Sequence, residues 1–221
     1  MQVKICGITS VEQGSAIAQL GATALGYICV KKSPRYITPE NIAPITAAIT
    51  ADYPDVQHFG VFADESLFTI LEVVKAAGLT TVQLHGDETP ATCQLLRDAL
   101  EMSNLSKVKL VKAFRIRADE DLATTQLYEP HVDALLLDAY HPEQLGGTGK
   151  TLDWQALKHF SPSRPWFLAG GLTPENVQTA LAQISPDGID LSSGVERSPG
   201  NKDLEKVRKL LENLGNTQHA S

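Results

Sequence analysis

Three ionisable side chains stand at the ends of apolar runs in this 221-residue sequence. Cys6 ends the first run, His85 ends a run that begins at position 80, and Asp138 ends one that begins at position 132. A glycine follows Cys6, so the backbone there can turn and come close to another group. A thiol, an imidazole and a carboxyl group can all transfer protons. These residues could do acid–base chemistry if the fold brings the ends of their runs together.

The elements that would position them form a repeated alternation of strand and helix. Strands are predicted at 3–9, 24–30, 56–63, 80–85, 108–114, 132–138, 166–169 and 188–191. Helices are predicted at 11–20, after 38, at 65–77, after 89, at 120–127, after 153, after a cap at Thr173, and at 203–214. This alternation favours parallel strands joined by right-handed crossovers. Eight units in about 220 residues predict a closed (βα)8 barrel. The alternative is an open doubly wound sheet, which usually carries fewer strands.

Length and composition indicate one domain over residues 1–215, followed by a frayed tail at 216–221. The formal net charge of −7 and the lack of a basic run argue against a nucleic-acid partner. No apolar run approaches the ~18 residues of a membrane span, and no secretory segment is expected. The three cysteines include no CxxC pair and the six histidines are scattered, so we expect neither a disulfide framework nor a metal site. A cytoplasmic, reducing setting fits these features.

Polar residues gather where the strands are predicted to end. In a barrel, the carboxyl ends of all the strands meet at one mouth, which is where ligands bind. A single polar residue at such a place would ordinarily be a turn former, whereas six sets of them predict a pocket. The six sets are Cys6-Gly7, Ser33-Pro34-Arg35, the stretch 83–87, Asp138, Gly170-Gly171 and the stretch 190–194.

The endings of the seventh and eighth strands have the composition of a phosphate site. Gly170-Gly171 and Ser192-Ser193-Gly194 would expose backbone N–H groups with no bulky side chain in the way. The phosphate site of many barrels lies in these two loops. The alternative is a pair of tight turns that merely need glycine.

A further glycine-rich stretch at 145–150 resembles a nucleotide-binding P-loop only in part. That motif requires a glycine where Gln144 stands, and no helix is predicted to begin at Lys150. We instead expect Gly146, Gly147 and Gly149 to form a mobile loop over the mouth of the pocket. No GxGxxG follows a strand, so no dinucleotide cofactor is predicted.

Eight blocks of the sequence, in the same order, closely resemble the phosphoribosylanthranilate isomerases of tryptophan biosynthesis. The blocks are 3–9 (VKICGIT), 33–37 (SPRYI), 60–62 (GVF), 82–88 (VQLHGDE), 136–138 (LLD), 146–154 (GGTGKTLDW), 168–172 (LAGGL) and 190–196 (DLSSGVE). The resemblance extends from the first strand to the last helix. Leu152, where the family commonly has Phe, and the variant second strand at 27–30 change no group that is expected to do chemistry.

The resemblance implies a (βα)8 isomerase without a cofactor. Its substrate would be N-(5-phosphoribosyl)anthranilate, and an Amadori rearrangement would give 1-(2-carboxyphenylamino)-1-deoxyribulose 5-phosphate. By position in the motifs, Cys6 would be the general base and Asp138 the general acid. A free thiol has a pKa near ~8.5 and a free aspartic acid near ~3.9, so these roles require lowering the first pKa and raising the second.

The charges of such a substrate suggest roles for the remaining polar residues. The guanidinium of Arg35 fits the anthranilate carboxylate. His85 and Asp190 would hold sugar or amine groups, or orient the catalytic pair. The phosphate would occupy the two loops at Gly170, Gly171, Ser192, Ser193 and Gly194.

The expected partner is therefore a small phosphorylated molecule, bound by a monomer or a homodimer. Two other functions stay open at this point. One is a related phosphosugar enzyme, such as the isomerase of histidine biosynthesis or indole-glycerol-phosphate synthase, although the synthase would need lysine and glutamate at several strand ends. The other is a catalytically inactive barrel that binds a phosphorylated ligand or a protein, against which the intact pair Cys6 and Asp138 argues.

Overall fold

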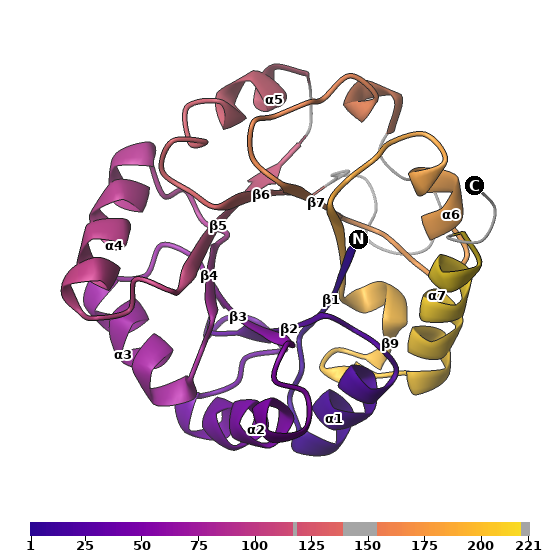
Figure 1. The fold of residues 1–221 in the computed structure, drawn as a ribbon, viewed down its shortest axis with the longest axis horizontal. Helices are drawn as coiled ribbons and strands as arrows, with labels where there is room; N and C mark the ends of the chain where they lie inside the picture. Colours follow the sequence, from indigo (N-terminus) through magenta and orange to yellow (C-terminus); the bar gives the residue numbers. More distant parts are fainter. Residues whose placement is uncertain (117–118, 139–153, 218–221) are drawn as a thin grey trace.

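The computed structural model describes residues 1–116, 119–138 and 154–217. Within these residues, eight parallel strands close into a barrel in chain order, and the last strand pairs with the first (Figure 1). The predicted (βα)8 architecture is thereby confirmed. The strands are β1 (Gln2–Cys6), β2 (Ala24–Ile28), β3 (Gln57–Phe62), β4 (Thr81–Leu84), β5 (Lys109–Arg115), β6 (Ala134–Asp138), β7 (Trp166–Ala169) and β8 (Gly188–Leu191).

Helices form an outer ring around this barrel (Figure 1). Several begin at the caps that the sequence indicates: the Thr89 hydroxyl accepts from the Thr92 N–H, with Pro90 at the first helical position. Gly78 ends α3 in the left-handed conformation, at φ 61°. The described helices are α1 (Val11–Gln19), α2 (Pro39–Asp52), α3 (Leu67–Ala77), α4 (Pro90–Met102), α5 (Asp119–Thr125), α6 (Val177–Leu181), α7 (Leu204–Thr217), and the 3-10 turns η1 (Trp154–Leu157) and η2 (Ser193–Val195).

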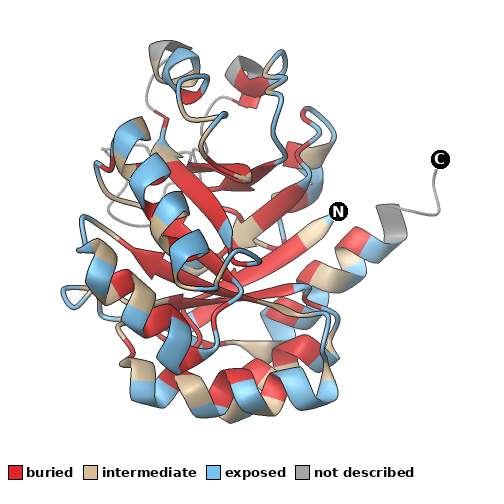
Figure 2. Cartoon of the chain, turned by 60° about the vertical axis from the view of Figure 1, so that its left-hand side comes forward, coloured by how far each residue is buried: buried red, intermediate tan, exposed pale blue. Residues whose placement is uncertain are grey.

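Two layers of core follow from the alternation of side chains along each strand. The outward-facing residues pack against the helices in one large cluster, so the strands are buried while the helices expose their outer faces (Figure 2). The inward-facing residues are mostly small, with two aromatic rings that fill the barrel. This inner cluster contains Ala24, Phe59, Val111, Ala113, Ala134, Leu136, Phe167 and Ala169.

The structure corrects the predicted start of the seventh helix. Thr173 does not cap it, since α6 begins at Val177. The side chain of Asn176 instead accepts from the Thr173 N–H at 2.8 Å and donates to the Gly171 carbonyl at 2.9 Å. Through these two hydrogen bonds, Asn176 holds the loop that follows β7 in place.

Other boundaries differ by a few residues. The first strand ends at Cys6 rather than residue 9, and Ser10 alone caps α1, because the Thr9 hydroxyl donates to the Gly200 carbonyl at 2.8 Å. Helix α7 extends to Thr217, two residues past the predicted domain boundary. The expected loop glycines Gly146, Gly147 and Gly149, and the chain end at 218–221, lie outside the described residues.

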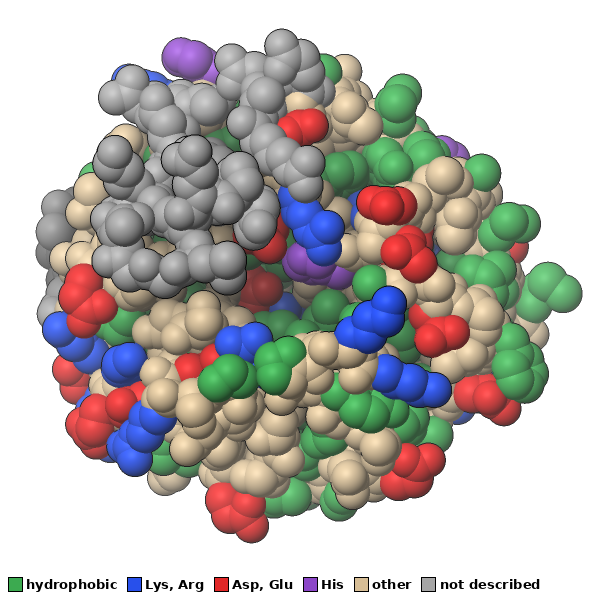
Figure 3. Space-filling model, turned by 180° about the vertical axis from the view of Figure 1, so that it is seen from behind, with side chains coloured by type: hydrophobic (Ala, Val, Ile, Leu, Met, Phe, Trp, Pro, Cys, Tyr) green, Lys and Arg blue, Asp and Glu red, His purple; other side chains and the backbone are tan. Residues whose placement is uncertain are grey.

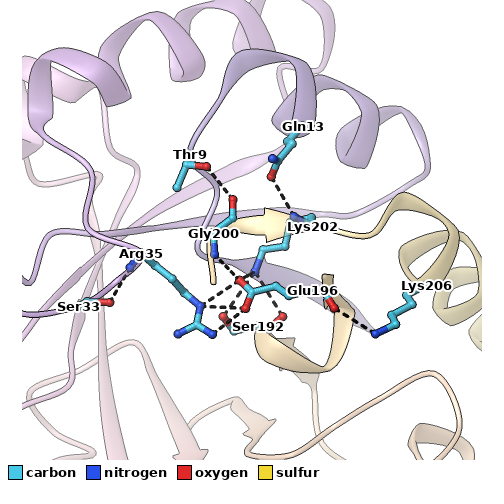
Figure 4. A network of polar contacts seen from close by, with 9 residues as sticks. All are labelled: Thr9, Gln13, Ser33, Arg35, Ser192, Glu196, Gly200, Lys202 and Lys206. Carbon is cyan, nitrogen blue, oxygen red and sulfur yellow. Dashed lines mark hydrogen bonds and ion pairs between the residues drawn. The ribbon is translucent and has the colours of Figure 1, made fainter. Parts of the chain in front are cut away.

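A small hairpin that the strand pattern did not predict follows β8. Strands β9 (Glu196–Ser198) and β10 (Asn201–Lys202) pair antiparallel around Gly200, which has φ 79°. The dipeptide Pro199-Gly200 is a turn signal that could have indicated it. Through Thr9 and Gly200, this hairpin is attached to the segment that follows β1 (Figure 4).

Every helix in the described part of the chain is too short or too polar to span a lipid bilayer.

Candidate active site

A cavity of about 450 Å³ opens at the carboxyl ends of the barrel strands. The face seen in Figure 3 is hollowed near its centre, with acidic, basic and histidine side chains around the hollow. The predicted site residues that the structure describes all line this one cavity: Cys6, Arg35, His85, Asp138, Gly170, Gly171, Asp190, Ser192, Ser193 and Gly194.

Cys6 is the last residue of β1, and the neighbouring strand makes room for its thiol. It pairs in register with Gly26 of β2. A Cβ at position 26 would lie 2.6 Å from the Cys6 Sγ and 3.1 Å from its Cα. A glycine in the middle of β2 therefore gives the thiol its space, and the Cys6 residue is only 5% exposed.

Gly7 is the place where the backbone comes close to other groups, as the sequence indicates. It has φ 88°, which favours glycine. A Cβ there would lie 2.8 Å from the Arg35 Cδ and 3.3 Å from the Lys202 Nζ. The cysteine is thus separated from two basic side chains by a residue that has no side chain.

Lys4, two residues before Cys6 on the same strand face, points into the barrel. Its ammonium forms an ion pair with Asp190 at 2.9 Å and lies 5.2 Å from the centre of the Phe59 ring. Burial opposes its charge, but the Asp190 carboxylate and the Cys6 side chain together outweigh burial and raise the pKa of Lys4. Lys4 is therefore a fixed positive charge beneath the cavity.

The expected lowering of the Cys6 pKa is not found. Burial raises the pKa of the Cys6 thiol and is the largest effect. The positive charge of Lys4 opposes this rise and the negative charge of Asp190 adds to it, while Lys202 also lowers the pKa. At neutral pH the free enzyme consequently carries Cys6 mainly as a thiol.

Asp138 ends β6 and faces His85, which follows β4. The His85 Nε2 lies 3.6 Å from the Asp138 Oδ2, and each side chain is 26% exposed. The other ring nitrogen, Nδ1, lies 3.1 Å from the amide nitrogen of Gln83. Gln83 is buried in the barrel beneath the cavity, so it holds the imidazole whose far edge meets the Asp138 carboxylate.

Arg35 reaches the cavity from the loop after β2, but one edge of its guanidinium is already occupied. Its Nε and Nη2 donate to the Glu196 carboxylate at 2.9 Å and 2.6 Å (Figure 4). This contact joins residues 161 positions apart. Arg35 therefore contributes its remaining edge to the cavity.

The two glycine-containing loops lie together at the β7–β8 side of the cavity. Gly170 and Gly171 have φ 89° and 64°, conformations that favour glycine. A Cβ at Gly194 would collide with the carbonyl oxygen of Leu172. The loops after β7 and β8 thus touch each other through backbone, which leaves both close to whatever occupies that end of the cavity.

Sequence reasoning missed several residues of the site. Arg115 also lines the cavity, at the end of β5 and beside Asp138 in register, whereas Gln83, which lines it too, belongs to the predicted stretch 83–87. Glu196 and Lys202 stand behind it, in the unpredicted hairpin. The position of Arg115 directly after a predicted strand could have indicated it as a site residue. Nothing in the sequence indicates that Glu196 pairs with Arg35.

No three or more His, Cys, Asp or Glu side chains of the described residues are grouped so that they could hold a metal ion. Cys6, Cys29 and Cys93 are free thiols in the structure.

This geometry agrees with the comparisons to known proteins. The model of the N-(5'phosphoribosyl)anthranilate (PRA) isomerase family matches residues 3–213. The chain belongs to this family. An N-(5'-phosphoribosyl)anthranilate isomerase of Nostoc punctiforme is 57% identical over 218 residues, which cover 99% of this chain and 100% of the relative.

Solved structures of the family have the same fold. The phosphoribosyl anthranilate isomerase of Thermotoga maritima superposes with a TM-score of 0.87 at 34% identity, covering 98% of this chain and 99% of that one. A second structure, in complex with reduced 1-(o-carboxyphenylamino)-1-deoxyribulose 5-phosphate, has a TM-score of 0.82 at 31% identity, with 98% and 99% covered. The chain is accordingly an isomerase of tryptophan biosynthesis.

Proposed function

We propose that the cavity is the active site in which N-(5'-phosphoribosyl)anthranilate isomerises to 1-(2-carboxyphenylamino)-1-deoxyribulose 5-phosphate, with Cys6 as the general base and Asp138 as the general acid. One observation carries the proposal: a thiol on β1 and a carboxyl group on β6 line the same cavity as the glycine–serine loops of β7 and β8. A base, an acid and an anion site are the groups that this reaction needs.

The reaction begins with opening of the furanose ring. Asp138 gives a proton to the ring oxygen as the C1–O bond breaks, and the nitrogen lone pair forms a Schiff base with C1. The resulting iminium makes the C2 proton acidic, and Cys6 removes it to give an enolamine. Tautomerisation of the enolamine then gives the ketone. His85, held by Gln83, keeps the Asp138 carboxyl group in place for the first step.

The raised pKa of Cys6 is compatible with the role of base if the substrate supplies positive charge. The iminium exists only after ring opening, and a positive charge beside a thiol favours the thiolate. The positive charge of Lys4, beneath the cavity, also favours the Cys6 thiolate. The base would thus be activated at the step that uses it.

The anions of the substrate would be bound at two places. The loops at Gly170, Gly171 and 192–194 would hold the phosphate, and the free edge of Arg35 would hold the anthranilate carboxylate. Asp190, paired with Lys4, would contact the sugar or the amine.

A turnover assay tests the proposal. Loss of anthranilate fluorescence reports conversion of the substrate, and both Cys6→Ala and Asp138→Asn should lower kcat by at least ~10²-fold, because positioned proton transfer commonly contributes that much. Product should still inhibit both variants, since the anion sites are intact. A folded Asp138→Asn protein with the wild-type kcat would show that another group is the acid.

We further propose that residues 1–215 act as one domain, in the cytoplasm, as a monomer or a homodimer. The phosphoribosylanthranilate isomerase of Thermotoga maritima is described as a dimer from which monomers were generated, which supports both states for this chain. Sedimentation at working enzyme concentration distinguishes the two states, and a larger assembly would contradict both.

A further inference from the structure

Glu196 is a buried carboxylate held between two cations. Its side chain is 4% exposed, and it lies behind the cavity rather than in its wall. It accepts two hydrogen bonds from the Arg35 Nε and one from Nη2, at 2.9, 3.1 and 2.6 Å. It also accepts from the Lys202 Nζ at 2.6 Å and the Gly200 N–H at 3.1 Å (Figure 4). A carboxylate with so many donors has a fixed orientation.

The orientation of Glu196 determines that of Arg35. A guanidinium is planar and carries its donors in a rigid fork, so binding one edge fixes the direction of the other. The Nη1 group of Arg35 makes no hydrogen bond to the described part of the chain, and the side chain lines the cavity at 21% exposure. Arg35 thus presents a pre-oriented pair of donors to whatever enters.

Glu196 is also linked, through Lys202, to residues 192–194 after β8, which belong to the proposed phosphate site and are called the phosphate loop here. The Lys202 ammonium donates to the Ser192 carbonyl at 3.3 Å and lies 3.5 Å from the Ser192 hydroxyl. Ser192 directly follows β8, in the loop that lines the anion end of the cavity. One carboxylate therefore connects the arginine of the β2 loop with the loop after β8.

The charges of the three side chains leave a net positive charge at this place. Burial opposes ionisation of Glu196, but hydrogen bonds from Arg35 and Lys202 outweigh it and lower its pKa to about 2. Glu196 is therefore charged at any pH at which the enzyme works. It balances one of its two cations, and the remaining positive charge favours an anionic ligand.

We infer that Glu196 is a positioning residue that fixes the guanidinium of Arg35 relative to the phosphate loop and thereby sets the distance between the two anion sites of the cavity. The inference rests on the proposed function in two respects, that Arg35 binds the carboxylate and that the loops after β7 and β8 bind the phosphate. Glu196 itself would not touch the substrate.

The experiment measures preference for the carboxylate rather than affinity alone. Titration calorimetry gives the Kd of reduced 1-(o-carboxyphenylamino)-1-deoxyribulose 5-phosphate and of the same compound without the carboxyl group. The ratio of the two constants is the carboxylate preference of each protein. A mutation that merely loosens the fold weakens both ligands together and leaves this ratio unchanged.

Glu196→Gln should lower the carboxylate preference at least ~10-fold, because the amide turns a donor towards the donors of Arg35 and a charge-assisted bidentate pair is lost. Asp133→Asn is the matched control. Asp133 also pairs with an arginine, at 2.9 Å from Arg97. This ion pair joins α4 to the segment before β6, so weakening it should leave the carboxylate preference unchanged.

Two further variants keep the test decisive. Arg35→Ala should abolish the preference, and if it does not, the proposed role of Arg35 fails independently of Glu196. Glu196→Asp keeps the charge for Lys202 and should show an intermediate preference even if Glu196→Gln does not fold. A wild-type preference in folded Glu196→Asp and Glu196→Gln, with the preference lost in Arg35→Ala, would overturn the inference.

Discussion

At the scale of single residues, the environment of Cys6 differs most from expectation. A thiol that serves as a base was expected to have a lowered pKa, yet burial raises it and Lys4 opposes the rise. Cys29 and Cys93 have pKa values raised by burial to about 12 and about 11. Cys6 differs from both in lining the cavity.

The pH dependence of alkylation reports this balance directly. The rate at which iodoacetamide labels Cys6, followed by peptide mass spectrometry, should rise with pH with a midpoint above the ~8.5 of a free thiol. Lys4→Met should move the midpoint higher, because it removes the cation that favours the thiolate. Lys75→Met, on the exposed face of α3, should leave it unchanged. An unchanged midpoint in Lys4→Met would show that Lys4 does not influence the thiol.

Sequence reasoning identified residues that stand directly at strand ends. Cys6, His85, Asp138 and Asp190 could be placed because the carboxyl ends of barrel strands meet. The amine of Lys4 could not be placed, since its contact with Asp190 depends on the closure of β8 onto β1. Contacts that form only when the barrel closes cannot be read from the sequence around either residue.

At the scale of elements, the strands could be predicted and the hairpin could not. Apolar runs between glycine and proline signals located the eight strands, although their ends moved by a few residues. Strands β9 and β10 have three and two residues, too few to show a period. The partners of Arg35 were missed for this reason, because Glu196 and Lys202 belong to that hairpin.

The contact between the loops after β7 and β8 can be tested with one methyl group. Gly194→Ala would place a Cβ against the Leu172 carbonyl oxygen. This oxygen belongs to the backbone, so relieving the clash requires a shift of the main chain. Overpacking of this kind costs about 1–3 kcal/mol, so we expect inhibition by inorganic phosphate to weaken ~10-fold, with a rise in KM. Gly215→Ala is the control, because no atom lies within 4 Å of its added Cβ. Phosphate inhibition at the wild-type level in folded Gly194→Ala would argue against a phosphate site in these loops.

At the scale of the whole molecule, the Glu196 network joins the first and last units of the barrel. It connects the β2 loop, the segment after β1 and the hairpin before α7. The folded pKa of Glu196, about 2, lies below its ordinary value of 4.5. Between these values the unfolded chain binds a proton that the folded protein does not, so this contribution to stability is present above about pH 4.5 and is lost as the pH falls towards 2.

Acid unfolding should therefore depend on this carboxylate. From pH 5 to 2.5, the free energy of unfolding of the wild type should fall by about 2 kcal/mol more than that of Glu196→Gln, which has no carboxylate to protonate. Urea titrations at the two pH values measure the difference. Parallel losses in the two proteins would mean that Glu196 is not a source of acid sensitivity.

The proposed mechanism depends on Cys6 being the base, and hydrogen exchange at C2 of bound substrate tests that role most directly. Mass spectrometry in deuterated solvent follows the exchange, and circular dichroism confirms that each variant is folded. Wild-type enzyme should exchange the C2 proton, and Cys6→Ala should stop the exchange even if the ring still opens. Asp138→Asn should also show no exchange, but with the closed furanose accumulating on the enzyme. A folded Cys6→Ala protein that exchanges C2 at the wild-type rate would contradict the assignment of Cys6 as the base.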